Sequence, residues 1–514
     1  MSTVIRNGRV IDPSTGTDEI IDVFLEGDRV VDAPEVIAPG TDEIDASGML
    51  VLPGFVDVHT HSDFTIAEEP QALARIHQGV TTDVTGNCGF SPFPLPVGRT
   101  EFGSFFGGSQ VEGHPDLDAY VDHLAGVGPA VNIAPLVGLG SVRHQVLGDA
   151  SRRPTSSELT QMQDHVTRAM EQGAFGASSG LVYVPGVYAS TAELREVLRP
   201  IGRARALYAT HLRDERDGLV PAVEEAISVA EDVGANLQIS HHKALGSENW
   251  GATEKTLKLV DEANARGLIE VAVDYYPYTA GSTGIASLMP PTALDEGWPA
   301  LRERLSDSVF RGSVLEHLNE AAQFRPTEVV IGRSRTWPGA SGRSVEDLAR
   351  RDGVSPAEVL LQLIQSEGER LTIVVPAASE TDLRSVMSHH RAMHGSDAWL
   401  MSKEQARYEH PRNLGSAVRV LVSAITGGTT LTRAVEHLAV LPARRLGLIG
   451  RGTLEPGAYA DLLVVDPSRA TAQEDRVNAF DYPDLMRWVF INGEPVIAAG
   501  KATGRRPGRT LRST

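Results

Sequence analysis

The sequence of 514 residues predicts an α/β protein whose main body is a (β/α)8 barrel of the TIM type. Three observations support this class. Short apolar strands alternate with amphipathic helices through the middle of the chain, both ends show short strands divided by turns, and one segment rich in Pro and Gly interrupts the alternation. Repeated alternation of strands and helices over this length favours a closed barrel over an open sheet.

Both ends of the chain contain a small β unit with Gly and Pro at the turns. The predicted strands of these units are residues 4–5, 9–11, 20–25, 29–31, 460–465 and 488–496, the last of them a hairpin. Because chain ends often lie close together, residues 1–54 and 448–514 are predicted to pair into one β-sandwich.

The alternating elements place the barrel in residues 55–283 and 339–447, and the Pro- and Gly-rich segment 284–338 is predicted to be an insertion. The predicted barrel strands are 52–58, 81–85, 131–137, 175–178, 207–210, 237–240, 269–274, 371–375 and 392–395. The helices predicted from apolar spacing are 156–172, 219–233, 253–266 and 344–365. Barrel enzymes carry their chemistry at the carboxyl ends of the strands, so the residues that follow each strand are the candidates.

The charge balance and the single cysteine exclude several classes of protein. The chain has 47 Lys and Arg against 67 Asp and Glu, a formal net charge of −20, whereas nucleic acids and anionic membranes are bound by basic surfaces. No apolar run approaches the roughly 18 residues that span a bilayer, and the first ten residues lack a secretory pattern. Cys88 is the only cysteine, which excludes an intramolecular disulfide and fits a reducing compartment. We therefore expect a cytoplasmic protein without nucleic-acid or membrane partners, and its oligomeric state stays open.

The first barrel strand ends in a pair of histidines, His59 and His61. Alternate residues of a strand share one face, so both imidazoles can point at one ion. A bare His-x-His pair more often consists of two surface histidines, but the apolar strand that leads into this pair favours a metal site.

Later strand ends add further side chains that can bind a metal. Cys88 lies in a glycine-flanked turn after the next strand, where a thiolate can reach an ion. His211 and His241 end two later strands, and His241 shares its face with Lys243. Asp397 follows the last strand, where it can be a ligand, a general base or both.

Five strand ends that carry His-x-His, Cys, His, His and Asp predict a site for a divalent ion, and the Cys and His donors favour Zn²⁺. The sequence contains no His-Glu-x-x-His, P-loop or Rossmann glycine pattern, which are the signatures of other catalytic classes. The constellation therefore points to metal-dependent chemistry.

Longer stretches around these residues carry a family resemblance. They are PGFVDVHTH at 53–61, GVTTDVTGNCG at 79–89, ATHLRDE at 209–215, ISHHK at 239–243, YPYTAGST at 276–283, GSD at 395–397, HPR at 410–412 and GAYADL at 457–462. On these motifs, nearly the whole chain resembles the amidohydrolase superfamily and, within it, the D-aminoacylase (N-acyl-D-amino-acid deacylase) family. The Asn-Cys-Gly and Ser-His-His-Lys motifs are the most specific, because most amidohydrolases bridge their metals with a carboxylated lysine where this family has the cysteine.

The resemblance implies a distorted (β/α)8 barrel, a β-sandwich built from both termini and a small insertion. It implies zinc as the cofactor, with one ion held tightly and a second position that is weaker or empty. The tight ligands would be Cys88, His211 and His241, and the second position would be formed by His59, His61 and Asp397. Asp397 would also be the catalytic acid and base.

The same resemblance implies zinc-dependent hydrolysis of the amide bond of N-acyl-D-amino acids, which gives a free D-amino acid and a carboxylate. The residues that match the positions for the substrate α-carboxylate are Lys243, Tyr276, Ser282 and Arg412. Anchoring of this carboxylate would fix which face of the α-carbon meets the metal. Tyr183 and Leu288 lie close to positions that line the side-chain pocket in relatives.

The chain departs from the family pattern at three places. Ala398, followed by Trp399, stands where relatives commonly have Gly after the catalytic Ser-Asp. The loop from 397 to 412 is longer than usual, and Leu139 stands where relatives often have His. Because the loop lies beside the carboxylate-binding positions, these departures bear on the substrate more than on the metal.

Two other interpretations stay open. A cyclic-amide hydrolase of the hydantoinase or dihydroorotase type shares the fold, but it would usually have a bridging lysine where Cys88 stands. A non-catalytic amidohydrolase-like scaffold would be expected to lose metal ligands, and this chain keeps the full set. The sequence does not fix the amino-acid side chain, the acyl group, or whether one or two metals bind.

Overall fold

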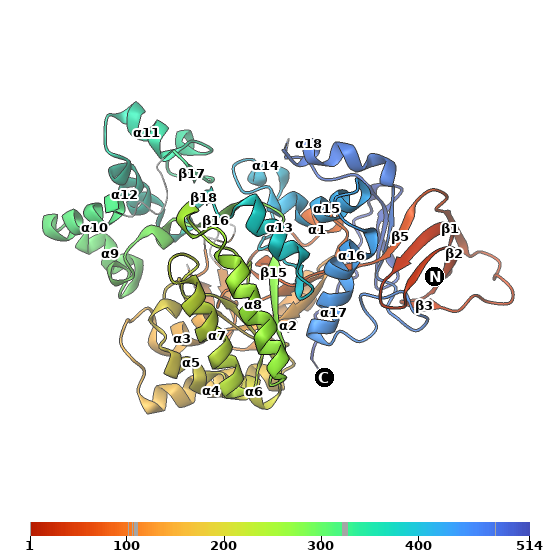
Figure 1. The fold of residues 1–514 in the computed structure, drawn as a ribbon, viewed down its shortest axis with the longest axis horizontal. Helices are drawn as coiled ribbons and strands as arrows, with labels where there is room; N and C mark the ends of the chain where they lie inside the picture. Colours follow the sequence, from red (N-terminus) through yellow and green to blue (C-terminus); the bar gives the residue numbers. More distant parts are fainter. Residues whose placement is uncertain are drawn as a thin grey trace.

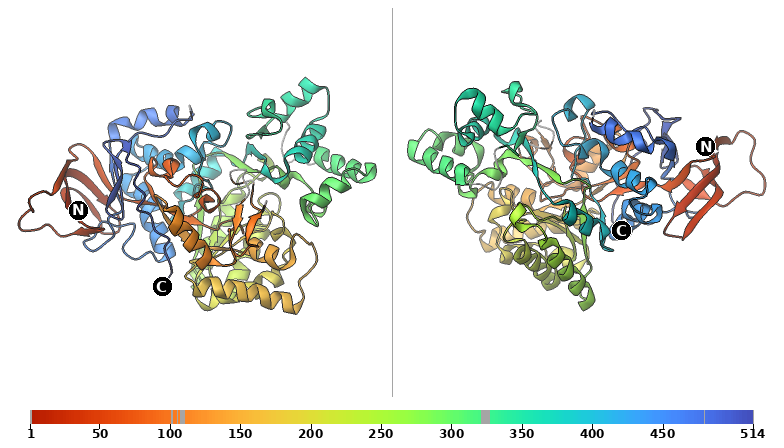
Figure 2. Two further views of the ribbon diagram at one scale, coloured as in Figure 1. Left: turned by 180° about the vertical axis from the view of Figure 1, so that it is seen from behind. Right: turned by 45° about the horizontal axis from the view of Figure 1, so that its top comes forward.

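The structure, a computed structural model, describes residues 2–100, 102–104, 106, 111–320, 327–478 and 480–513. A sheet made from both chain ends lies at one end of the long axis, a helical unit lies at the other, and the barrel lies between them (Figure 1). The views in Figure 2 show the same arrangement of the three parts.

Within the described residues, eight parallel strands form the barrel. In order around it they are β6 (Phe55–Asp57), β7 (Val80–Thr85), β10 (Asn132–Pro135) continued by β11 (Val137–Gly138), β12 (Gly176–Gly180), β13 (Leu207–His211), β14 (Asn236–Ile239), β15 (Val271–Tyr275) and β19 (Ala392–His394). The N–H of Val58 donates to the carbonyl of His394 over 3.4 Å, and the N–H of Asp397 donates to the carbonyl of His59 over 2.8 Å. The last strand therefore meets the first, and the predicted barrel is confirmed.

The segment predicted as one strand at 52–58 belongs to two sheets. β5 (Leu50–Pro53) pairs with strands of the terminal sheet, and β6 starts the barrel two residues later. Gly54 stands at the junction, where a Cβ atom would clash with the side chain of Thr81. The backbone passes here from one domain to the other.

Helices cover the outside of the barrel with their apolar faces toward the strands. α4 (Ser156–Glu171) begins with a capping box, in which the Thr155 hydroxyl accepts from the Glu158 N–H and the Glu158 carboxylate accepts from the Thr155 N–H. α7 (Leu219–Val233) ends at Gly234, whose φ of 83° suits glycine. The surrounding helices include α2 (Leu117–Val127), α3 (Leu139–Leu147), α5 (Thr191–Val197), α6 (Arg199–Arg203), α8 (Ala252–Arg266), α13 (Glu380–Ser388), α15 (Arg412–Ile425), α16 (Leu431–Val435) and α17 (Leu441–Leu446).

Both chain ends contribute to one nine-stranded sheet. Its strands are β1 (Ser2–Asp12), β2 (Thr17–Glu26), β3 (Arg29–Val31), β4 (Asp42–Asp45), β5, β20 (Leu462–Val465), β21 (Met486–Ile491), β22 (Glu494–Ala498) and β23 (Lys501–Ala502). β5 pairs with β1 on one side and with β20 on the other, which joins the N-terminal strands to the C-terminal ones. Apolar side chains from both groups, among them Ile5, Val23, Leu462 and Phe490, share one core.

The inserted unit is larger than the predicted segment 284–338. Its antiparallel sheet consists of β16 (Ala280–Gly284), β17 (Val330–Ile331) and β18 (Thr372–Pro376), and its helices are α9 (Gly297–Arg304), α10 (Ser308–Glu320), α11 (Val345–Asp352) and α12 (Pro356–Glu367). The prediction of a barrel strand at 371–375 is wrong, because among the described residues β18 pairs with β16 and β17 of this small sheet and with no barrel strand. The helix predicted at 344–365 is two helices, since Gly353 ends the first with a φ of 68°. The domain boundaries stay a prediction, and this pairing favours an insertion that continues to Pro376.

Among the described residues, no helix is both long and apolar enough to cross a membrane.

Candidate metal centre and active site

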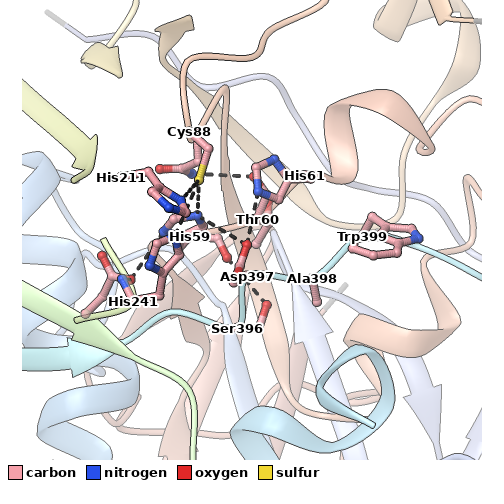
Figure 3. Close-up of polar contacts among 12 residues, drawn as sticks. His59, Thr60, His61, Cys88, His211, His241, Ser396, Asp397, Ala398 and Trp399 are labelled. Atoms are coloured by element: carbon pink, nitrogen blue, oxygen red, sulfur yellow. Dashed lines mark hydrogen bonds and ion pairs between the residues drawn. The ribbon is translucent and has the colours of Figure 1, made fainter. Parts of the chain in front are cut away.

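The predicted metal-binding side chains meet at the carboxyl ends of the barrel strands (Figure 3). His59 follows β6, Cys88 follows β7, His241 follows β14 and Asp397 follows β19. One donor atom from each of these four residues lies within 4.8 Å of the donor atoms of the other three. Buried donors from four strand ends at this spacing can surround a single ion.

The Cys88 thiol is the centre of this cluster. Its Sγ lies 3.3 Å from Nε2 of His59, 3.8 Å from Nδ1 of His211 and 3.7 Å from Nε2 of His241. All four side chains are buried. The three ligands expected at the tight position are therefore in mutual reach, and His59 is next to them.

Three residues of the site have a left-handed backbone. The φ angles are 51° at Cys88, 35° at His241 and 53° at Asp397. Residues other than glycine occupy this left-handed region at a cost of roughly 1–3 kcal/mol. Gly86 makes the turn before Cys88 possible, because a Cβ atom there would collide with the carbonyl of Leu136. Such local strain at three donor positions is typical of a functional site.

The ring nitrogens that face away from the cluster contact two buried carboxylates. Nδ1 of His59 lies 3.2 Å from Oδ1 of Asp274. Nδ1 of His241 lies 3.1 Å from Oε1 of Glu215, and Nε2 of His211 lies 3.6 Å from Oε2 of the same residue. Carboxylates behind ligand histidines orient the rings and make them better ligands.

His61 is placed differently from the other histidines. Its Nε2 lies 3.2 Å from Oδ1 of Asp397, and its ring stacks on Phe106 with a centroid distance of 3.8 Å. Its Nδ1 has no hydrogen-bond partner among the described residues. In the part of the chain that the structure describes, His61 therefore has an aromatic neighbour and no carboxylate hydrogen-bonded to its far nitrogen.

The electrostatics of the cluster favour charged donors. Burial opposes ionisation of the Cys88 thiol, but the charge on His59 and the close contacts with His211 and His241 hold its pKa well below the usual range. Burial also opposes ionisation of Asp397, yet the neighbouring Arg412 guanidinium and the hydrogen bond from His61 keep the pKa of this carboxyl well below its ordinary value. A thiolate and a carboxylate are thus available to a cation.

A cavity of about 260 Å³ opens beside the cluster. Its walls include His211, His241, Lys243, Tyr276, Ser282 and Asp397. Lys243 forms an ion pair of 2.7 Å with Glu215. Burial alone would lower the pKa of the lysine, but the negative charge of Glu215 has the larger effect and raises it. The cavity therefore presents a buried ammonium group close to the metal-binding residues.

Arg412 is engaged by other groups of the site. Its Nη1 donates to Oδ2 of Asp397 over 2.6 Å, and its Nη2 donates to the carbonyl of Ser282 over 3.1 Å. Its guanidinium lies 5.0 Å from the centre of the Tyr276 ring. In this arrangement the arginine fixes the direction of the Asp397 carboxylate.

The remaining predicted residues divide between the cavity and the core. Tyr183 lines the cavity and its hydroxyl lies 3.2 Å from that of Thr283, whereas Leu288 packs in the core of the inserted unit. Leu139 begins α3 and is buried. Trp399 is buried to the side of the metal-binding cluster and packs edge-on against Phe106, with ring centroids 6.0 Å apart (Figure 3).

Sequence reasoning assigned no role to Glu215 and Asp274, which support the ligand histidines. A signal existed for Glu215, because it lies four residues after His211 in a stretch of five charged residues from 213 to 217. Asp274 is the last but one residue of β15 and lies beside the cluster, where it also accepts hydrogen bonds from the His241 N–H and the Gln238 amide.

The donors present suit zinc. A thiolate with two imidazole nitrogens is a donor set that zinc prefers, and further histidine and carboxylate donors lie next to it. Carboxylates on the far nitrogens are also usual around zinc-binding histidines.

Comparisons with known proteins agree with this chemistry. A model of the amidohydrolase family matches residues 42–285. The chain is 32% identical to D-aminoacylase of Alcaligenes xylosoxydans xylosoxydans, over 99% of this chain and 97% of that protein. It is 30% identical to the N-acyl-D-aspartate deacylase of the same organism, over 99% of this chain and 94% of that protein.

A solved structure is similar over its whole length. The crystal structure of N-acyl-D-glutamate deacylase from Bordetella bronchiseptica, complexed with zinc and a phosphonate inhibitor, has 31% identity, covers 99% of both chains and gives a TM-score of 0.84. Barrel, donor cluster and family model together define a metal-dependent amidohydrolase. More narrowly, the chain belongs to the D-aminoacylase (N-acyl-D-amino-acid deacylase) family.

Proposed function

We propose that this chain hydrolyses the amide bond of N-acyl-D-amino acids with zinc as its cofactor. Cys88, His211 and His241 would hold one zinc ion tightly. His59, His61 and Asp397 would form a second, weaker position. The observation that carries the proposal is a buried thiolate–histidine cluster that opens into a cavity with the ammonium group of Lys243.

The chemistry divides between the metal and Asp397. When bound, zinc supplies a Lewis acid that polarises the amide carbonyl and lowers the pKa of a water molecule toward about 7. Asp397, ionised and directed by Arg412, accepts a proton from the attacking water through its carboxylate. It then gives this proton to the nitrogen of the leaving amine as the C–N bond breaks, so that the products are a carboxylate and a free D-amino acid.

The substrate α-carboxylate would bind in the cavity next to the metal-binding cluster. Lys243 supplies the positive charge there, and the Tyr276 and Ser282 hydroxyls supply hydrogen bonds. The role of Arg412 in this contact stays a prediction, and its two hydrogen bonds favour a role in orienting Asp397. Anchoring of the carboxylate would give the preference for D substrates.

A second, apolar pocket of about 50 Å³ adjoins the cavity and shares the residues Val182, Tyr183 and Ser287 with it. Its wall contains Phe90, Phe102, Val184, Ala286, Leu294 and Trp298. Asp149 is its one charged side chain among the described residues, and this carboxylate accepts a hydrogen bond from His144 over 2.8 Å. We propose that an uncharged group of the substrate, its acyl chain or its side chain, extends into this pocket.

The alternatives have weaker support. A cyclic-amide hydrolase would usually have a bridging lysine, whereas Cys88 stands between the histidines here. A scaffold without activity would not need a complete donor set beside a cavity. The cytoplasmic location and the small-molecule partner stay predictions.

The proposal is tested by the release of free amine from paired N-acetyl-D- and N-acetyl-L-amino acids with the zinc-loaded chain. Selective cleavage of the D compounds supports it. Cleavage of dihydroorotate or hydantoins without cleavage of the acyl amino acids would favour the cyclic-amide hydrolase instead.

A further inference from the structure

One carboxylate, that of Glu215, contacts two of the residues expected to hold the tight zinc ion. Oε1 lies 3.1 Å from Nδ1 of His241, and Oε2 lies 3.6 Å from Nε2 of His211. The opposite nitrogens of the two rings, Nε2 of His241 and Nδ1 of His211, face the Cys88 thiol. Glu215 is only 4% exposed, so water does not replace these contacts.

This geometry favours one tautomer of each imidazole, because Nδ1 of His241 lies within hydrogen-bond distance of the Glu215 carboxylate and the charge of the same carboxylate favours a proton on the near nitrogen of His211. A neutral imidazole carries its proton on one nitrogen, and only the other nitrogen has a lone pair for a metal. With its proton directed at the Glu215 carboxylate, each ring presents its unprotonated nitrogen toward Cys88. This one carboxylate thereby selects, in both rings, the tautomer that can bind a metal.

Glu215 also holds the ammonium group of Lys243. The ammonium nitrogen lies 2.7 Å from Oε1 of Glu215, but it also lies 3.0 Å from Nδ1 of His241. If the lysine donated to Nδ1, the ring proton would move to Nε2, and that nitrogen would lose its lone pair for the metal. A negative charge on Glu215 holds the ammonium group and leaves Nδ1 to keep its own proton.

We propose that Glu215 is a positioning residue that keeps His211 and His241 in the metal-binding tautomer and prevents Lys243 from capturing Nδ1 of His241. This inference rests on the proposed function, since it concerns the same zinc and the same substrate-binding lysine. It makes zinc retention depend on a residue that is not itself a ligand.

The experiment measures zinc affinity by competition with a chromophoric chelator, in the full chain and with zinc alone as the probe. Glu215→Gln should lower the affinity by about 10- to 100-fold, the usual effect of removing a carboxylate behind ligand histidines. Lys243→Met alone should leave it within twofold. Adding Lys243→Met to Glu215→Gln should restore about tenfold, because the competing donor is gone. Asp214→Asn is the matched control, since Asp214 lines the same cavity but its carboxylate accepts from the N–H groups of Arg216 and Gly218.

Recovery in the double variant supports the proposal, because loss of a merely structural residue would not be repaired by a second substitution. Zinc affinity within twofold of the wild type in Glu215→Gln, or no recovery in the double variant, would overturn it. If Glu215→Gln does not fold, Glu215→Asp is the second test: its shorter side chain reaches only one ring, and an unchanged zinc affinity would again contradict the proposal. If the wild type binds zinc and cleaves D substrates but Glu215→Gln keeps the zinc affinity of the wild type, only this inference is refuted. A wild type that does neither refutes the proposed function as well.

Discussion

Oδ2 of Asp397 accepts a hydrogen bond of 2.6 Å from Nη1 of Arg412, in an ion pair with both side chains largely buried. The second arm of the same guanidinium donates to the carbonyl of Ser282. The arginine thus ties the proposed catalytic carboxylate to the edge strand β16 of the inserted unit. The direction of Asp397 depends on a planar group with two donors, which a single ammonium group cannot reproduce.

Arg412→Lys should therefore lower kcat by about 10- to 100-fold, corresponding to the loss of one charge-assisted hydrogen bond of about 1.5–3 kcal/mol. KM should change little, because Lys243 remains to bind the substrate carboxylate. Steady-state kinetics with an N-acetyl-D-amino acid measure both constants. A large rise in KM with kcat preserved would instead assign Arg412 to carboxylate binding.

Lys243→Met removes the ammonium group that lines the cavity. The expected result is a KM about 10- to 100-fold higher, since a charged hydrogen bond to the carboxylate is worth about 1.5–3 kcal/mol. Zinc content, measured by atomic absorption, should stay at the wild-type level. An unchanged KM would show that the α-carboxylate binds elsewhere.

Ala286→Trp should fill the apolar pocket that adjoins the cavity. We expect KM to rise about tenfold for substrates with a large apolar group and to stay within twofold for N-acetyl-D-alanine, which is the internal control. Each methylene excluded from the pocket costs about 0.8 kcal/mol, or about a factor of four. Two substrate series, one varying the acyl chain and one the amino-acid side chain, identify which group occupies the pocket. Equal effects on all substrates would contradict this use of the pocket.

His437 predicts a loss of stability in acid. It is buried, Tyr275 hydrogen-bonds its Nδ1, and burial together with the charge of Arg433 lowers its pKa to about 3. Between about pH 6.5 and pH 3, His437 is protonated in the unfolded chain but not in the folded one. The free energy of unfolding therefore falls as the pH falls through this range, by up to about 1.4 kcal/mol per pH unit.

Replacing His437 by Asn removes this titration. Urea unfolding of the wild type and of His437→Asn at pH 7, 6 and 5 should show a free energy of unfolding that declines less steeply with acid in the variant. The comparison cancels the effect of acid on zinc binding, which both proteins share. Parallel curves would mean that His437 does not titrate in this way.

The sequence patterns predicted the barrel well because strand ends and helices have local signatures. His211 and His241 lie at or just after the ends of short apolar strands, and in the structure both side chains lie next to Cys88. The strand at 371–375 was assigned to the wrong sheet, because an apolar run shows that a strand exists but not which partner it pairs with.

Contacts between side chains that are distant in sequence were beyond such patterns. Nothing local to Asp274 indicates that it lies against His59, since Asp274 is on β15, the seventh barrel strand, and the contact with the first strand end forms only when the barrel closes. The pairing of Arg412 with Asp397 was missed for a related reason: a family motif places the residues but not their partners. Both contacts depend on tertiary packing, which local sequence patterns do not describe.

The most direct test of the account is zinc content and turnover measured together for the wild type and Asp397→Asn. The variant keeps the shape of the side chain but cannot accept the proton, so turnover of an N-acetyl-D-amino acid should fall by about 10²- to 10⁴-fold while about one zinc ion per chain remains. Loss of zinc in the variant would make Asp397 a structural ligand, and near-normal turnover would show that another group carries the proton.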